Sequence, residues 1–223
     1  MNAYIKAASA LTLFGGGLAF LMALEQMVPR VKTRYNRLLF FFLLTTGWFL
    51  VCIGLVVLDI AAVHPWTMFL FLTVIFAVGP LGLLYFHSLL EPVKPLTYRV
   101  LVHLLPAGLI MAAEIIMFPL THWYSDMGIG RLLSDPLHHA LTPLIIAGAL
   151  HMIGYFSYLL KISLPLRESQ EARAEVRIVI GIEIAAIFLV SMIMAGFLGK
   201  SKVLMVTGSM IDALLHIVLF LAR

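Results

Sequence analysis

The chain contains few charged residues. Only 12% of its 223 residues are Asp, Glu, Lys or Arg, whereas 62% are hydrophobic. Soluble domains carry about a quarter charged residues, so this composition excludes an ordinary soluble protein and indicates an integral membrane protein. The net charge of +4 comes from basic residues that are scattered through short polar segments. We therefore expect no basic patch of the kind that binds nucleic acid directly.

Cysteine is almost absent, since Cys52 is the only one. One cysteine excludes an intrachain disulfide and a metal cage built from cysteines. Histidine is present, but the motifs H-x-x-x-H and H-E-x-x-H are missing. A metal site, if there is one, must therefore be assembled from residues far apart in the sequence.

Lysine is missing from the interior of every long apolar segment, including the last one, Val203 to Arg223. A retinal Schiff base requires a lysine inside a helix. The sequence therefore excludes a retinal protein of the usual type, and no retinal cofactor is expected.

Long apolar runs are abundant, and each is long enough to cross a bilayer, whose core of about 30 Å takes roughly 20 helical residues. An open sheet cannot satisfy its backbone hydrogen bonds in lipid, so these segments should be helices. We predict an all-α, seven-transmembrane-helix bundle that forms a single domain over residues 1–223. The predicted spans are 7–28, 38–60, 67–90, 100–119, 137–160, 178–199 and 203–222.

Basic residues are distributed unequally between the two ends of these spans. Eleven of the 15 Lys and Arg residues follow the first, third, fifth and seventh spans; the exceptions are Lys6, Arg131, Lys200 and Lys202. The positive-inside rule assigns the richer side to the cytoplasm. We therefore predict an N-terminus outside and a C-terminus in the cytoplasm.

Several ionisable residues lie inside the predicted spans, where they are costly and must face the bundle interior or a partner. Asp212 and His216 are four residues apart and share one face of the seventh helix. His103 and Glu114, three turns apart, should share a face of the fourth helix. His151 and Glu183 add one such group each in the fifth and sixth helices. Three interpretations stay open for all six: polar contacts that join helices, a ligand-binding or switch site, or a site for a catalytic metal.

A second group of candidates lies toward the outer side. His138, His139 and Asp59 carry side chains that ordinarily bind a divalent metal such as Zn²⁺. We name them as a candidate metal site, although adjacent histidines on a helix point about 100° apart.

Glycine and proline mark other features of the helices. Gly15 to Gly17 indicate close contact between helices rather than a ligand site. Pro80, Pro106 and Pro143 are predicted to interrupt the third, fourth and fifth helices, where they either free backbone carbonyls and allow kinks or merely shape the packing of the helices.

The stretch "GPLGLLYFHSLLEPVKPLTYRVLVHLLPAGLIMAAEI", residues 79–115, carries a Gly-Pro with aromatics, a basic loop with a proline, and then an H-x-x-P. It resembles the seven-helix N-terminal membrane domain of bacterial membrane-bound AraC-type transcription regulators. The resemblance implies a multi-pass sensor in the bacterial cytoplasmic membrane, with a cytoplasmic DNA-binding output domain after the last helix. Our sequence has no helix-turn-helix motif before Arg223, so we expect that this chain binds no DNA itself.

Two main functions remain after these exclusions; a transporter is a weaker third, because the sequence shows no inverted repeat. The leading hypothesis is a membrane receptor domain that binds a small amphipathic ligand, such as a lipid, or a metal ion, and signals to the cytoplasmic output domain. The alternative is a seven-helix, metal-dependent lipid hydrolase. No catalytic residue can be assigned, which favours a role other than that of an enzyme, and the oligomeric state is open.

Overall fold

The structure is a computed structural model that describes residues 2–28, 34–90, 102–121, 141–166 and 174–221. Every regular element within these ranges is helical. The long helices are α1 (Ala3–Glu25), α2 (Arg34–Val57), α4 (Phe71–Leu90), α6 (Leu105–Thr121), α8 (Thr142–Leu166), α9 (Ala174–Leu198) and α10 (Lys202–Leu221). Three short elements join them: α3 (Ile60–Val63), η1 (Pro65–Met68) and η2 (Val102–Leu104).

The predicted all-α class is confirmed for the described residues, and each predicted span corresponds to one long helix. Within the described ranges, five helical stretches are long and apolar enough to cross a membrane: Ala3–Glu25, Arg34–Val57, Trp66–Ser88, Thr142–Pro165 and Val179–Leu198. Val102–Met117 is a shorter apolar helix. The chain therefore has the helices of a membrane protein, while the count of seven spans stays a prediction.

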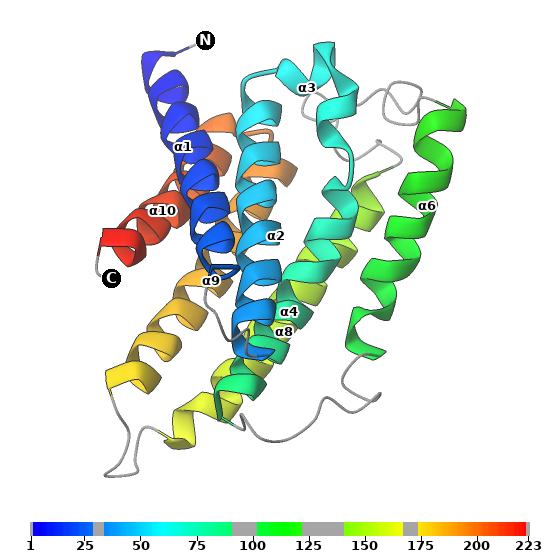
Figure 1. The fold of residues 1–223 in the computed structure, drawn as a ribbon. Helices are drawn as coiled ribbons and strands as arrows, with labels where there is room; N and C mark the ends of the chain where they lie inside the picture. The colour runs from blue at the N-terminus through cyan, green and yellow to red at the C-terminus, as the bar shows by residue number, and fades with distance from the viewer. Residues whose placement is uncertain (1, 29–33, 91–101, 122–140, 167–173, 222–223) are drawn as a thin grey trace.

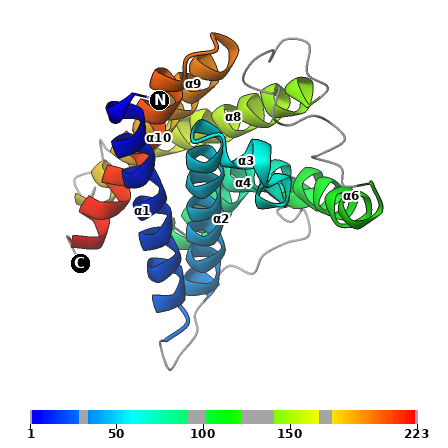
Figure 2. The same cartoon turned by 90° about the horizontal axis from the view of Figure 1, so that it is seen from above.

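Six of the long helices pack into a closed ring. Neighbours around the ring are α1, α2, α4, α8, α9 and α10, and α10 returns to pack on α1 (Figures 1 and 2). The remaining helix, α6, packs mainly on α4 and lies outside the ring (Figure 2). In the ring, α4 itself lies between α2 and α8.

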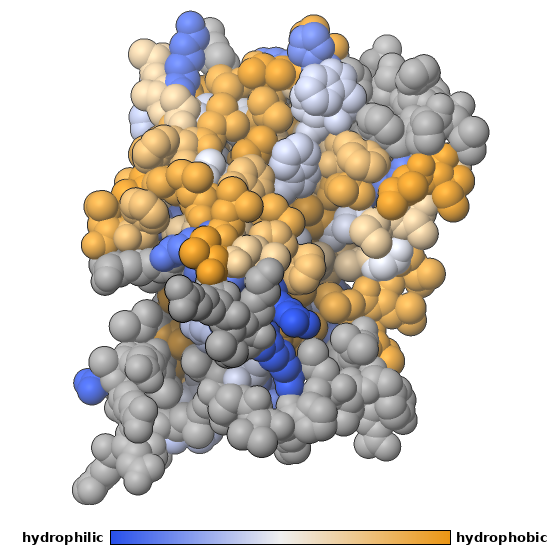
Figure 3. Space-filling model, in the orientation of Figure 1, coloured by the Kyte–Doolittle hydropathy of each residue, from blue (hydrophilic) through white to orange (hydrophobic). Residues whose placement is uncertain are grey.

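Both the centre and the outside of the ring are apolar. A cavity of about 40 Å³ lies at the centre, with Phe49, Ile75, Met152 and Ile193 among the residues that line it. Apolar side chains also cover most of the described surface in Figure 3. Exposed examples from five helices are Phe14, Leu24, Phe41, Leu109, Ile116, Leu150 and Phe188. An apolar exterior of this extent is what contact with lipid tails requires.

Glycines allow α1 to approach both of its neighbours closely. A Cβ atom added to Gly15 would lie 2.3 Å from Cβ of Ala213 on α10. One added to Gly16 would lie 2.9 Å from the carbonyl oxygen of Gly47 on α2. The prediction of close helix contact is confirmed for these two glycines, whereas Gly17 meets nothing within 4 Å.

Two of the three prolines do not act as predicted. Pro106 and Pro143 are each the second residue of their helix, α6 and α8 respectively. A proline costs nothing there, because N–H groups of the first turn have no partner within the helix. Both helices start later than the sequence suggested, and of the three only Pro80 lies inside a helix, α4.

Candidate functional site

The six ionisable candidates do not form one cluster, because they occupy four separate places in the bundle. Two of these places involve a single candidate, and two involve a pair. The four are Glu114 between α6 and α4, Glu183 between α9 and α8, Asp212 with His216 on α10, and His103 with His151 near Tyr155.

Glu114 is fully buried and caps a neighbouring helix. Its carboxylate accepts hydrogen bonds from the backbone N–H groups of Leu72 at 3.3 Å and Thr73 at 3.1 Å, and from the Thr73 hydroxyl at 2.5 Å. N–H groups of the first turn of α4 have no partner in their own helix, and a carboxylate there also complements the helix dipole. This contact supports the interpretation of Glu114 as a group that joins helices.

Glu183 connects α9 to α8 and is 3% exposed. The Ser163 hydroxyl donates to its Oε1 at 3.0 Å and is also 2.9 Å from the carbonyl oxygen of Leu159. The other carboxyl oxygen, Oε2, is buried and has no hydrogen-bond partner among the described residues. Glu183 is therefore an incompletely satisfied polar group inside the bundle.

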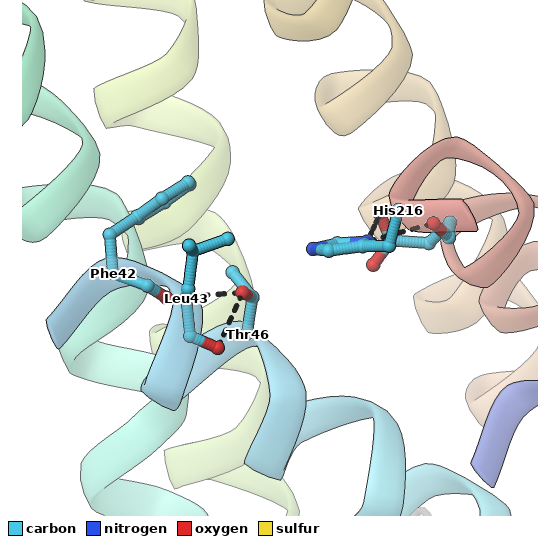
Figure 4. Close-up of polar contacts among 5 residues, drawn as sticks. Phe42, Leu43, Thr46 and His216 are labelled. Atoms are coloured by element: carbon cyan, nitrogen blue, oxygen red, sulfur yellow. Dashed lines mark hydrogen bonds and ion pairs between the residues drawn. The ribbon is translucent and has the colours of Figure 1, made fainter. Parts of the chain in front are cut away.

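Asp212 and His216 share one face of α10, as predicted. His216 Nδ1 lies 2.9 Å from the backbone carbonyl oxygen of Asp212 and 3.8 Å from its Oδ1. The imidazole ring is directed toward the turn of α2 that carries Thr46 (Figure 4). Thr46 uses its hydroxyl on its own helix, bonding to the carbonyl oxygens of Phe42 and Leu43 at 3.0 and 3.2 Å. The Asp212–His216 pair therefore lies where α10 packs against α2. Its hydrogen bond stays within α10, and those of Thr46 stay within α2.

His103, His151 and Tyr155 form what we term the imidazole cluster. His103 Nδ1 and the Tyr155 hydroxyl are 2.7 Å apart, and their rings meet edge to face. The rings of His151 and Tyr155 are 4.7 Å apart between centroids, and Phe76 of α4 lies 5.4 Å from His151. His151 Nδ1 is buried, and no hydrogen-bond partner for it lies in the part of the chain that the structure describes. His103 is exposed, and the other two side chains are partly exposed, so the cluster opens to the surroundings of the bundle.

Three elements bring the cluster together. Tyr155 follows His151 by four residues, so both lie on one face of α8. Gly79 of α4 allows α8 to approach, since a Cβ there would lie 3.0 Å from Cβ of Tyr155. His103 enters from η2, immediately before α6.

His103 and Glu114 were predicted to share one face of the fourth helix, and this prediction is wrong. Glu114 is buried against α4, while His103 is exposed and bonds to α8. The reason is that His103 lies in a 3₁₀ turn before α6 and not in the helix itself. Sequence reasoning also missed Tyr155, although its spacing from His151 was a signal that could have identified it.

Only one member of the candidate metal site is described. Both carboxylate oxygens of Asp59 lie within 2.7 Å of Lys202 Nζ, so Asp59 is paired with the ammonium group of a lysine. His138 and His139 lie outside the described residues. Within the described ranges, no three His, Cys, Asp or Glu side chains gather closely enough to hold a metal ion. The candidate metal site stays a prediction.

Comparisons with known proteins give no match for this chain. No family model matches the chain, and no curated protein or solved structure matches it significantly.

Proposed function

We propose that the chain is the membrane sensor domain of a receptor in a bacterial cytoplasmic membrane. It binds a small amphipathic ligand at the imidazole cluster and signals to a cytoplasmic DNA-binding output domain. The observation that carries the proposal is the hydrogen bond between His103 and Tyr155, at a cluster that opens to the surroundings of the bundle. The imidazole cluster brings together two predicted switch residues that are far apart in the sequence, His103 of η2 and His151 of α8.

The basic residues support the predicted orientation across the membrane. Arg34, Arg37, Lys161 and Arg177 belong to the start of α2, the end of α8 and the start of α9, which lie at one end of the molecule (Figure 1). Lys6, Lys200 and Lys202 lie near the start of α1 and the turn between α9 and α10, at the opposite end. With all seven long helices across the bilayer, the first end faces the cytoplasm.

The packing supports a ligand that enters from the lipid. The central cavity of about 40 Å³ has room for little more than water-sized molecules, so it cannot take an amphiphile. The imidazole cluster, by contrast, lies between α8 and the start of α6, a helix that packs mainly on α4. A ligand there contacts one ring helix and one peripheral helix together.

A route for the signal follows from the order of the ring. The cluster includes two residues of α8, α8 packs on α9, and α9 packs on α10. A change in the position of α8 is thus passed through two helix contacts to the end of α10. In our orientation α10 starts at the outer end and runs toward the cytoplasmic side (Figure 1). Nothing in the described residues favours the alternative, a metal-dependent hydrolase.

The test is hydrogen–deuterium exchange of the purified chain in nanodiscs, with and without added amphiphiles. Dodecanoate, dodecyl phosphate and dodecyltrimethylammonium are suitable probes because they share a tail and differ in the head. We expect at least one to slow exchange at residues 102–109 and 151–158 and to change exchange in α9 and α10. Binding that leaves α9 and α10 unchanged for every probe would contradict a sensor role.

A further inference from the structure

We propose that the imidazole cluster binds the phosphate of an anionic phospholipid from the cytoplasmic leaflet. The inference rests on the proposed function for its orientation in the membrane, and it names the class of ligand. Three observations carry it: the hydrogen-bonding capacity of the cluster, its lack of carboxylates, and its place at one end of α6.

The cluster presents hydrogen-bond donors to its surroundings. An imidazole nitrogen accepts hydrogen bonds better than a phenol oxygen, so neutral His103 accepts the Tyr155 hydroxyl proton at Nδ1 across 2.7 Å. Its own proton then lies on the other nitrogen, Nε2. When His103 is protonated, Nδ1–H donates to Tyr155, and both Nε2–H and the phenol O–H are left to donate. In both states the matching ligand group is an acceptor, and a phosphate has several acceptor oxygens.

The surroundings of the cluster suit an anion. Among the described residues, the hydrogen bond and the ring contacts of His103, His151 and Tyr155 involve no carboxylate. An anionic head therefore meets no described negative charge at this place.

The depth of the cluster suits a lipid of the cytoplasmic leaflet. His103 precedes the first turn of α6, at the end of the molecule where α2 begins (Figure 1). From there toward the opposite end, α6 and α8 expose apolar side chains, including Leu109 at 64% and Leu150 at 63%. Gly154, three residues after His151, is exposed, and a Cβ there would meet nothing within 4 Å. A phosphate at His103 thus places acyl chains along an apolar surface that runs toward the midplane.

Native mass spectrometry of the chain released from nanodiscs tests the inference. Nanodiscs of equal phosphatidylglycerol and phosphatidylcholine content are expected to yield protein that retains phosphatidylglycerol preferentially. His103→Leu removes the Nε2–H donor. Tyr155→Phe removes the hydroxyl that holds neutral His103 through Nδ1 and that itself donates to the ligand when His103 is protonated. Each variant should reduce retention about tenfold, which corresponds to one hydrogen bond to a charged group. His103→Gln, whose amide keeps a donor near the position of Nε2, should retain more lipid than His103→Leu.

Matched variants separate binding from general damage. Gly154→Leu adds a side chain beside His151 at a position where a Cβ meets nothing within 4 Å, so it should reduce retention. Gly181→Leu on α9 is its control, because a Cβ at Gly181 also meets nothing within 4 Å. Tyr4→Phe is the control for Tyr155→Phe, since it also removes an interhelical hydroxyl contact, with Thr207 at 2.7 Å, at the other end of the bundle. Both controls should retain lipid like the parent.

Three results would overturn the lipid site: equal retention of the two lipids by the parent, unchanged retention in His103→Leu and Tyr155→Phe, or full displacement by millimolar inorganic phosphate. The last result would indicate a site for a soluble anion. Failure of the proposed function has a different signature, namely phosphatidylglycerol held at the cluster with no change of exchange in α9 and α10. Conversely, a change in α9 and α10 caused by another amphiphile, without retained phosphatidylglycerol, overturns the lipid inference and leaves the sensor role intact.

Discussion

Glu114 on α6 holds the first turn of α4 through Thr73, with one carboxylate oxygen bound to both the backbone N–H and the hydroxyl of that residue. The two residues are 41 positions apart in the sequence. Leu70, just before α4, has a φ of 63°, so the chain enters this helix through a left-handed residue. The peripheral helix α6 is thus attached to the ring by a buried polar contact as well as by apolar packing.

Replacing Glu114 tests this attachment. We expect Glu114→Ala to lower the free energy of unfolding by about 2 kcal/mol, because it removes a cap and leaves buried N–H groups unpaired. Glu114→Gln keeps one acceptor oxygen and should cost less. Thermal unfolding in detergent measures both, and hydrogen exchange should increase at residues 71–75. An alanine variant that unfolds like the parent would show that the contact is not structural.

Adjacent glycines on α1 give a matched pair for helix packing. Gly15→Leu should destabilise the bundle by about 3 kcal/mol or more, because its side chain would overlap Ala213 of α10 and force the helices apart. Gly17→Leu adds the same side chain in open space and should leave stability unchanged or slightly raised. Thermal unfolding of the two variants side by side is the measurement. Equal effects of the two substitutions would mean that α1 and α10 do not pack through Gly15.

The ion pair between Asp59 and Lys202 should contribute little, although it joins the end of α2 to the start of α10. The side chain of Asp59 is 62% exposed, and exposed pairs contribute about 0.2–1 kcal/mol. A double-mutant cycle with Asp59→Asn and Lys202→Met should therefore give a coupling energy in this range, and added salt should reduce it. A coupling above about 2 kcal/mol would indicate that the pair is shielded from water, for instance by a partner.

Glu183→Gln should be tolerated. The Ser163 hydroxyl has one proton for two acceptors, Glu183 Oε1 and the Leu159 carbonyl oxygen. An amide N–H at position 183 can donate to the Ser163 oxygen, which frees the serine proton for Leu159. We expect the free energy of unfolding to stay within about 0.5 kcal/mol of the parent, whereas Glu183→Lys should prevent folding because it buries a cation without a partner. A loss above 1 kcal/mol in Glu183→Gln would mean that the carboxylate itself is required.

Labelling of single cysteines tests the orientation. Cys52 is fully buried, so Cys52→Ser provides a background without an accessible thiol. In spheroplasts, a membrane-impermeant maleimide should label Lys6→Cys directly but should label Lys161→Cys and Arg177→Cys only after permeabilisation. All three positions are exposed in the structure, so failure to label cannot be due to burial. The reverse pattern would invert the proposed topology and would place the imidazole cluster at the outer end.

The sequence by itself determined the class of protein and the approximate position of each long helix. Both follow from length and apolar content, which are local properties, because about 20 apolar residues must be helical in lipid. The close packing at Gly15 and Gly16 was also predictable, since small residues allow helices to approach in a membrane protein. The start of α6 was not, because Pro106 is compatible both with a kink and with a first turn.

Only the tertiary structure decided which polar groups meet. Glu114 bonds to Thr73 of α4, and His103 bonds to Tyr155, which is 52 positions away in the sequence. In a soluble helix, the apolar stripe identifies the face that turns inward. Here the centre of the ring and the lipid are both apolar, so hydrophobic periodicity does not indicate how each helix is rotated or which helices are neighbours. The partners of these buried groups therefore depend on the order of the helices around the ring, which only the folded structure reveals.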